Sequence, residues 1–185
     1  MLRVSNLTLS RGGRSLVNNL DFTVMPGEAL LITGANGSGK STLASAIAGN
    51  FKADSGSIEI SGKLGVLLQN IEIDFPILVE EFIDMAGTEV ANNELIGRLI
   101  TEEIRDRKIT QLSVGQLQRV EMAQVLKLNP DYYLLDEPFS AQDKENTELL
   151  IEIFKVLKAK GKGILIINHI QLNLDGLIDE VLNLS

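Results

Sequence analysis

The stretch "GANGSGKST", from Gly34 to Thr42, decides the fold. It satisfies the pattern G-x-x-x-x-G-K-[ST], and it sits between the apolar, strand-like run "ALLITG" and the helix-forming run "KSTLASAIAG". A loop in this context turns successive backbone N–H groups toward one anion, and the helix N-terminus adds about half a unit of positive charge. The stretch therefore predicts an α/β protein with a site for the phosphates of a nucleotide.

The residues of this loop have distinct expected roles. Gly37 and Gly39 let the backbone curl around the anion, and Lys40 is expected to reach the β- and γ-phosphates, which makes it a candidate catalytic residue. The hydroxyl of Ser41 is expected to hold Mg²⁺. A chance glycine turn is the alternative, and the correct flanks on both sides count against it. The expected nucleotide-binding residues of the loop are Gly34, Asn36, Gly37, Ser38, Gly39, Lys40, Ser41 and Thr42.

A pair of carboxylates follows the apolar run "YYLLD". Asp136 is placed at the carboxyl edge of the sheet, where ligands of open α/β folds bind, and it can hold Mg²⁺ through water beside Ser41. Glu137 comes one step later and can orient or deprotonate an attacking water. A solvated acidic turn is the alternative, because Asp-Glu pairs are common; the phosphate loop in the same chain favours the metal and base roles.

Composition excludes several classes of protein. The 185 residues, 44 % of them hydrophobic, suit one globular domain over residues 1–185, with no segment near the ~18 uninterrupted apolar residues of a membrane span. The polar N-terminus "MLRVSNLTLSRGG" lacks the apolar stretch of a signal peptide, so we expect a cytosolic protein. The absence of cysteine excludes disulfides and thiol chemistry. A net charge of −8 and only two Tyr, six Phe and no Trp argue against a nucleic-acid partner.

The phosphate-loop motif indicates a P-loop NTPase, and the order of the expected elements predicts a mostly parallel central sheet. Residues 1–34 alternate apolar and polar positions and form an N-terminal antiparallel β subdomain, followed after the first helix by the strands "GSIEIS" and "GKLGVLLQ". The acidic, amphipathic runs "VEEFIDMAG" and "NNELIGRLITEEI" indicate a helical subdomain over about residues 70–112. Helices over about 114–128 and 144–160 then alternate with the strands "YYLLD" and "GILIIN", which implies a sheet covered on both sides.

A second anion-binding device occurs in "TQLSVGQLQRV", Thr110 to Val120. Ser113 and Gly115 place a hydroxyl and an exposed N–H at the start of a helix. One nucleotide cannot easily be wrapped by both devices of one chain, but two copies that meet head-to-tail can each close over the nucleotide held by the other. The alternative for these residues is an N-capped helix.

At "LSVGQ" the chain resembles the ATP-binding cassette (ABC) family, whose signature is usually LSGGQ. Val114 replaces the first glycine, while Ser113 and Gly115, which face the γ-phosphate in that family, are intact. Gln116 completes the motif and joins the expected nucleotide-binding residues.

Further motifs follow the order of the same family. The resemblance implies that Gln69 of "LLQN" touches Mg²⁺ and couples to a partner protein. It also implies that "SAQD" is the loop at a dimer seam; this loop is usually SALD in the family, and Gln142 replaces the leucine here. It makes His169 a contact to the γ-phosphate. Each motif also has an alternative when taken singly: Gln69 can be a surface residue, His169 a structural histidine, and "SAQD" a cap for the next helix.

One expected feature is absent. The family commonly stacks adenine on an aromatic residue from the N-terminal strands, and the corresponding position in "LTLSRGGRS" is Arg11. A guanidinium can stack on a base, and a solvated turn arginine is an equal alternative. ATP remains the expected nucleotide.

The resemblance implies an ATP-binding and ATP-hydrolysing transporter subunit that uses Mg²⁺. It implies an ATP-dependent head-to-tail homodimer docked on an integral membrane permease, and hence a cytoplasmic protein on the inner face of the cell membrane. "IDFPILVEEFIDMAG" is similar to zinc and manganese importer ATPases, whereas "RGGRSLVNNLDFTV" and "DEPFSAQD" are similar to haem-exporter ATPases of cytochrome c maturation. These similarities fix neither the substrate nor the direction of transport.

Two other functions stay open from the sequence. A cytosolic ABC ATPase with an assembly role, such as iron–sulfur cluster assembly, would carry the same motifs. A small kinase or GTPase would explain the phosphate loop but would leave "LSVGQ" and His169 without a role. The chain ends soon after His169, so we expect no appended regulatory domain.

Overall fold

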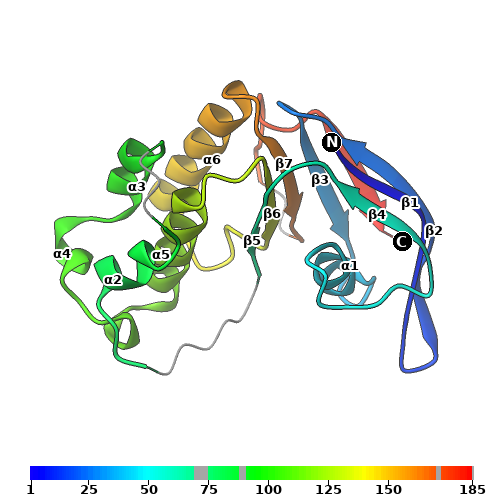
Figure 1. Cartoon of the computed structure of the whole chain (residues 1–185), viewed down its shortest axis with the longest axis horizontal. Coiled ribbons are helices and arrows are strands. Elements are labelled where there is room, and N and C mark those ends of the chain that lie inside the picture. The colour runs from blue at the N-terminus through cyan, green and yellow to red at the C-terminus, as the bar shows by residue number, and fades with distance from the viewer. Residues whose placement is uncertain (69–74, 88–90, 170–171, 185) are drawn as a thin grey trace.

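The computed structural model describes residues 1–68, 75–87, 91–169 and 172–184 (Figure 1). Three of its strands form an antiparallel sheet in the order β2-β1-β4. Their bounds are β1 (Leu2–Arg11), β2 (Arg14–Val24) and β4 (Ser55–Ile60). The turn "RGGR" joins β1 to β2, with Arg11 paired to Arg14, so the expected N-terminal antiparallel subdomain is confirmed and gains β4 as its third strand.

The central sheet runs in the order β5-β6-β7-β3-β8, and within the described residues all of its strand pairs are parallel. The bounds are β3 (Ala29–Gly34), β5 (Leu64–Leu67), β6 (Tyr132–Asp136), β7 (Gly163–Ile167) and β8 (Glu180–Leu184). The parallel sheet was expected, but β8 was not. It is a mostly exposed edge strand, so it lacks the continuous apolar run that identified β3, β6 and β7.

The crossover helices have nearly the expected bounds, at α1 (Lys40–Ile47), α5 (Val114–Lys127) and α6 (Lys144–Ala159). The insertion between β5 and α5 contains α2 (Val79–Asp84), α3 (Asn93–Leu99), α4 (Glu102–Arg105) and the 3₁₀ turn η1 (Ile109–Gln111). No helix in the described residues is long and apolar enough to cross a bilayer.

One of the amphipathic runs of the helical insertion forms two helices in the structure. The run "NNELIGRLITEEI" divides into α3 and α4 because Ile100 and Thr101 have extended backbones. Thr101 takes the N-cap position of α4, a place that Thr favours, and the first turn of α4 is acidic, which suits a helix N-terminus. The amphipathic pattern continues across the break, so periodicity alone did not reveal it.

The core lies on both faces of the parallel sheet, and strand β6 alternates between them. Tyr133 and Leu135 pack among residues of α5, α6 and the helical insertion, whereas Leu134 packs with α1 and the antiparallel sheet. In Figure 1, α1 accordingly lies between the two sheets, and α5 and α6 cover the opposite face. Each fully buried Leu or Ile contributes about 1.5–3 kcal/mol. The two faces together fix the strand ends from which the motifs extend.

Helix α5 carries one acidic side chain, Glu121, which is partly buried. Burial raises the pKa of the Glu121 carboxyl from its ordinary value of 4.5 to about 7. The folded state therefore holds this proton more tightly than the unfolded chain, and ionisation of Glu121 disfavours the fold as the pH rises from about 4.5 to 7.

We therefore expect Glu121→Gln to raise the melting temperature at pH 8, by about 2–4 °C if the relieved penalty is about 1 kcal/mol. At pH 5 the gain should shrink, because wild-type Glu121 is then protonated. Thermal unfolding followed by circular dichroism at both pH values measures the difference. Glu59→Gln, at an exposed position in β4, is the control and should change neither curve. An equal gain at both pH values would contradict the buried-charge explanation.

Candidate functional site

The parallel register brings the chemical motifs to one edge of the sheet. Asp136 at the end of β6 pairs with Ile167 of β7, and Ile167 pairs with Ile32 of β3, so the three strands end side by side. The phosphate loop leaves β3 there, Glu137 follows β6 and His169 follows β7. Segments far apart in the sequence thus meet where ligands of open α/β sheets bind.

The phosphate loop is held in shape by close backbone contacts. A Cβ atom at Gly34 would lie 2.4 Å from the carbonyl oxygen of Leu184 in β8, so no side chain fits there. Gly39 has φ 98° and forms the left-handed N-cap of α1. The Nζ of Lys40, a mostly buried side chain, donates to the carbonyl oxygens of Gly34 at 2.8 Å and Ala35 at 3.0 Å. The ammonium is therefore folded back over the loop in which an anion is expected to bind.

Asp136 is a buried carboxylate whose Oδ1 has no hydrogen-bond partner. Burial raises its pKa to about 6, the Glu137 carboxylate adds to the rise, and the Lys40 ammonium opposes it. An orphaned buried carboxylate oxygen next to a phosphate loop fits a cation site. Within the described residues, no group of three or more His, Cys, Asp or Glu could hold a metal. A cation here would have to complete its shell with substrate oxygens and water, as Mg²⁺ does.

Glu137 is buried, with φ 55°, in the left-handed region that few non-glycine residues occupy. Its Oε1 lies 2.6 Å from Nδ1 of His169, and its Oε2 is buried without a partner. An ionised carboxylate only accepts, so Nδ1 carries the proton in this pair. His169 thus fixes one oxygen of Glu137 and leaves the other available to a water molecule.

A cleft of about 530 Å³ opens above these groups. It brings together most of the residues predicted for the nucleotide site, including Arg11, Lys40, Glu137 and His169. Its lining is Arg11, Leu16, Asn36, Gly37, Gly39, Lys40, Ser41, Thr42, Glu137 and His169. Gly34, Ser38 and Asp136 do not line it. Leu16 was not predicted, because one apolar residue in an alternating strand carries no functional signal.

The second predicted anion-binding device, at Ser113 and Gly115, does not line this cleft within one copy. Ser113 is the N-cap of α5: its Oγ accepts from the N–H of Gln116 at 3.2 Å, and Oε1 of Gln116 accepts from the N–H of Ser113 at 3.0 Å. The N-capping alternative is therefore realised. Ser113, Gly115 and Gln116 do not line the phosphate-loop cleft, so the structure of one copy does not bring them to the predicted nucleotide site.

The remaining two motif predictions have different outcomes. In "SAQD", Asp143 is the N-cap of α6 and its Oδ1 accepts from the N–H of Asn146 at 2.8 Å, as the capping alternative expected. Gln69 lies outside the described residues.

The ABC transporter family profile matches residues 17–140, which is more than half of the chain. The chain belongs to the ABC transporter family. It is therefore an ABC-type ATPase domain with the P-loop NTPase fold, and the alternative of a different P-loop class, a kinase or GTPase, is set aside.

Several individual relatives of this chain are named as import ATP-binding proteins. The zinc import ATP-binding protein ZnuC of Rhizobium johnstonii is 34 % identical over 177 residues, which are 91 % of this chain and 58 % of that protein. The taurine import ATP-binding protein TauB of Shigella flexneri is 33 % identical over 188 residues, 91 % of this chain and 73 % of that protein. The chain thus spans less than two thirds of the zinc import relative.

A solved dimeric structure of a bacterial ABC transporter cassette superposes with a TM-score of 0.83 at 25 % identity, covering 100 % of this chain and 94 % of that one. The predicted similarity to zinc importer ATPases is confirmed. The similarity to haem-exporter ATPases stays a prediction.

The position of Arg11 in the cleft yields a test of base recognition. We expect Arg11→Ala to weaken ATP binding about tenfold, the effect of losing a contact of ~1–1.5 kcal/mol such as a stacked guanidinium. Isothermal titration with ATP measures the dissociation constant. Arg14→Ala is the matched control, because Arg14 pairs with Arg11 across the same hairpin but does not line the cleft. Equal affinity in both variants would remove Arg11 from the site.

Proposed function

We propose that this cassette is the ATP-hydrolysing subunit of an ABC importer, working as a head-to-tail homodimer on a separate integral membrane permease. The observation that carries the proposal is the separation of the two anion-binding devices: the phosphate loop and Glu137 line one cleft, while Ser113 and Gly115 stand away from it. A second copy is needed to complete each site. The zinc and taurine import proteins named above support import as the direction.

ATP binding would first displace Lys40. The ammonium exchanges the carbonyls of Gly34 and Ala35 for the β- and γ-phosphates, which are stronger acceptors. Ser41 and Asp136, joined by Gln69 according to the family resemblance, would hold Mg²⁺. When bound, this ion neutralises charge on the phosphate oxygens. The unpartnered Oδ1 of Asp136 supports this assignment.

Glu137 would act on the attacking water. His169 fixes Oε1, so the free Oε2 can accept a hydrogen bond from the water and take its proton as the oxygen attacks the γ-phosphorus. The bond between the γ-phosphorus and the bridging oxygen then breaks, giving ADP and inorganic phosphate. His169 is 44 % exposed at its side chain, so it can also face the γ-phosphate.

Closure of the dimer would supply the mechanical output. Ser113 and Gly115 of one copy would cover the triphosphate of the other and exclude water from the cleft. Loss of the γ-phosphate removes the group that bridges the two copies, so the dimer reopens. The cycle of closing and opening can drive a coupled permease.

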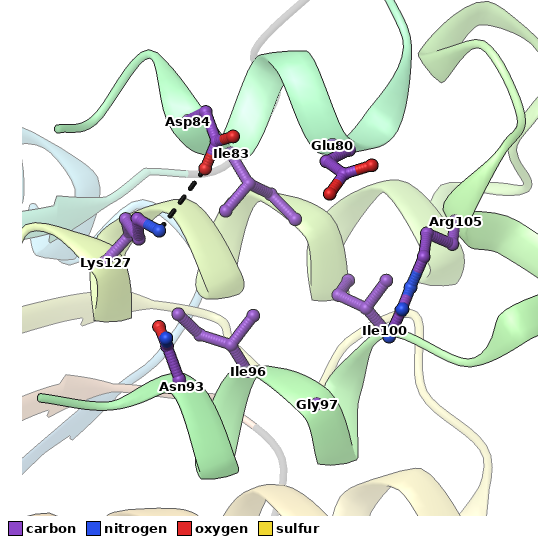
Figure 2. A pocket seen from close by; sticks show the side chains of 9 residues that line it. All are labelled: Glu80, Ile83, Asp84, Asn93, Ile96, Gly97, Ile100, Arg105 and Lys127. Carbon is purple, nitrogen blue, oxygen red and sulfur yellow. Dashed lines mark ion pairs between the residues drawn. The ribbon is translucent and has the colours of Figure 1, made fainter. Parts of the chain in front are cut away.

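The helical insertion offers the surface for that permease. Phe75, Leu78 and Met85 expose 50 %, 38 % and 66 % of their surfaces there. A hollow of about 240 Å³ lies in the same insertion, lined by apolar and charged side chains from α2 to α5. Figure 2 shows Ile83, Ile96 and Ile100 around this hollow, with the 3.3 Å ion pair between Asp84 and Lys127 beside it. A cytoplasmic segment of the permease docked here would hold the cassette on the inner face of the membrane.

Glu137→Gln tests the assigned base. The amide keeps the shape of the side chain but cannot take a proton, so turnover should fall by about 10²–10⁴-fold while ATP still binds. An ATP-bound dimer should then accumulate. Phosphate release and light scattering after gel filtration measure the two effects. A variant that hydrolyses ATP at the wild-type rate would refute the assignment.

Ser113→Arg tests the shared site. The long cation at the start of α5 should block closure over the partner's nucleotide, leaving a monomer with little turnover even at saturating ATP. Ser57→Arg, at an exposed position in β4, adds the same charge elsewhere and should behave as wild type. Full hydrolysis by a solitary Ser113→Arg chain would overturn the two-copy site.

A further inference from the structure

The backbone of Glu137 is held by an unusual number of hydrogen bonds. Its N–H donates to the carbonyl of Ile167 at 2.8 Å. Its carbonyl oxygen accepts from Nε2 of Gln118 at 2.9 Å, from Oγ of Ser140 at 3.0 Å and from the N–H of Ser140 at 3.2 Å. A left-handed backbone at a non-glycine residue persists only where its surroundings impose it. These bonds impose it on Glu137, whose φ is 55°.

Among these donors, Gln118 is the one that comes from a distant element. Ser140 belongs to the same turn as Glu137, whereas Gln118 reaches across from α5. Its side-chain amide therefore ties the position of Glu137 to the helix whose N-cap is Ser113.

A second glutamine fixes the amide of Gln118. Nε2 of Gln142 donates to Oε1 of Gln118 at 2.8 Å and to the carbonyl oxygen of Gly115 at 3.1 Å. The chain of bonds ends on carbonyls at Gly115 and Glu137, which only accept, so each amide must present its NH₂ group to them. Oε1 of Gln118 is then left to accept from Gln142, and neither amide can flip without losing a bond.

We propose that Gln118 and Gln142 are positioning residues that hold Glu137 in its hydrolytic geometry. The inference rests on the proposed function, in which Glu137 is the base. Gln142 is the position at which "SAQD" departs from the usual SALD, and a leucine there would fill the space but could donate to neither Gly115 nor Gln118. Gln142 thus makes two directed bonds, to the carbonyl oxygen of Gly115 and to Oε1 of Gln118, and Gln118 in turn donates to the backbone of Glu137.

The test is steady-state hydrolysis by Gln118→Leu, Gln142→Leu and the double variant in the full-length chain. We expect kcat to fall about tenfold in each single variant, because a small misplacement of a catalytic group is costly, with KM for ATP changed less than about twofold. The kcat of the double variant should be about equal to that of the slower single variant, because both residues act through the same bond to Glu137.

Gln124→Leu is the matched control. Gln124 is also a glutamine of α5 whose amide donates to a carbonyl, that of Phe82 at 2.7 Å, but it ties α5 to α2. It should lower the melting temperature about as much as Gln118→Leu while leaving kcat unchanged. An equal fall in kcat for Gln124→Leu would show a general loss of stability and would overturn the positioning role.

A further arm separates positioning from a contact at the dimer seam. In the Glu137→Gln background, Gln142→Leu should still form the ATP-bound dimer, because the two bonds of Gln142 lie within one chain. Loss of that dimer would make Gln142 an interface residue and would overturn the proposal.

A wild-type kcat in Gln142→Leu would also overturn the positioning role of Gln142, while leaving the assignment of Glu137 as the base intact. A wild-type chain without ATP turnover would instead refute the proposed function, and this inference with it.

Discussion

The parallel pairing of β7 with β3 on one side and with β6 on the other is the constraint on which the site depends. Because the three strands run in the same direction and in matched register, their carboxyl ends deliver the phosphate loop, Asp136-Glu137 and His169 to one edge. A slip of one residue in β6 would turn Asp136 to the opposite face. The two buried faces, with α1 on one and α5 and α6 on the other, prevent such a slip.

The charged groups at this edge of the sheet fit the proposed ligand, a triphosphate bound together with a cation. Lys40, Asp136 and Glu137 are all buried, and buried charges are tolerated where they are paired or hydrogen-bonded. Lys40 satisfies its ammonium on the carbonyls of its own loop, whereas Asp136 and Glu137 each keep one carboxylate oxygen without a partner. Folding alone gives no reason for those two orphaned oxygens. The proposed Mg²⁺-bound triphosphate at Asp136 and attacking water at Glu137 would supply one.

The sequence predicted what is encoded locally. The phosphate loop is recognisable because strand, turn and helix are adjacent in nine residues, and β6 and β7 are recognisable because strands buried on both faces are continuously apolar. The break between α3 and α4 is not visible in the sequence, because the apolar period continues through Ile100. Strand β8 was missed because its edge position needs little apolar character. The bonds of Gln142 were out of reach, because they join segments separated by 24 and 27 positions and glutamine pairs carry no pattern.

Two separate physical constraints favour a glycine at position 115. The family resemblance explains this glycine by an N–H that must approach a partner's phosphate. In the structure a Cβ atom at Gly115 would lie 2.3 Å from the carbonyl oxygen of Ala141 in the same chain, so the loop after Glu137 could not pack against α5. That packing also sets the place from which Gln142 reaches Gln118. A side chain at position 115 would therefore disturb both the proposed anion site shared with a second copy and the position of Glu137, the proposed base, in its own chain. Ser113 differs from Gly115 in this respect. Among the hydrogen bonds of the described residues, its side chain bonds only within the first turn of α5, so a substitution of Ser113 affects the proposed anion site and leaves the position of Glu137 unchanged.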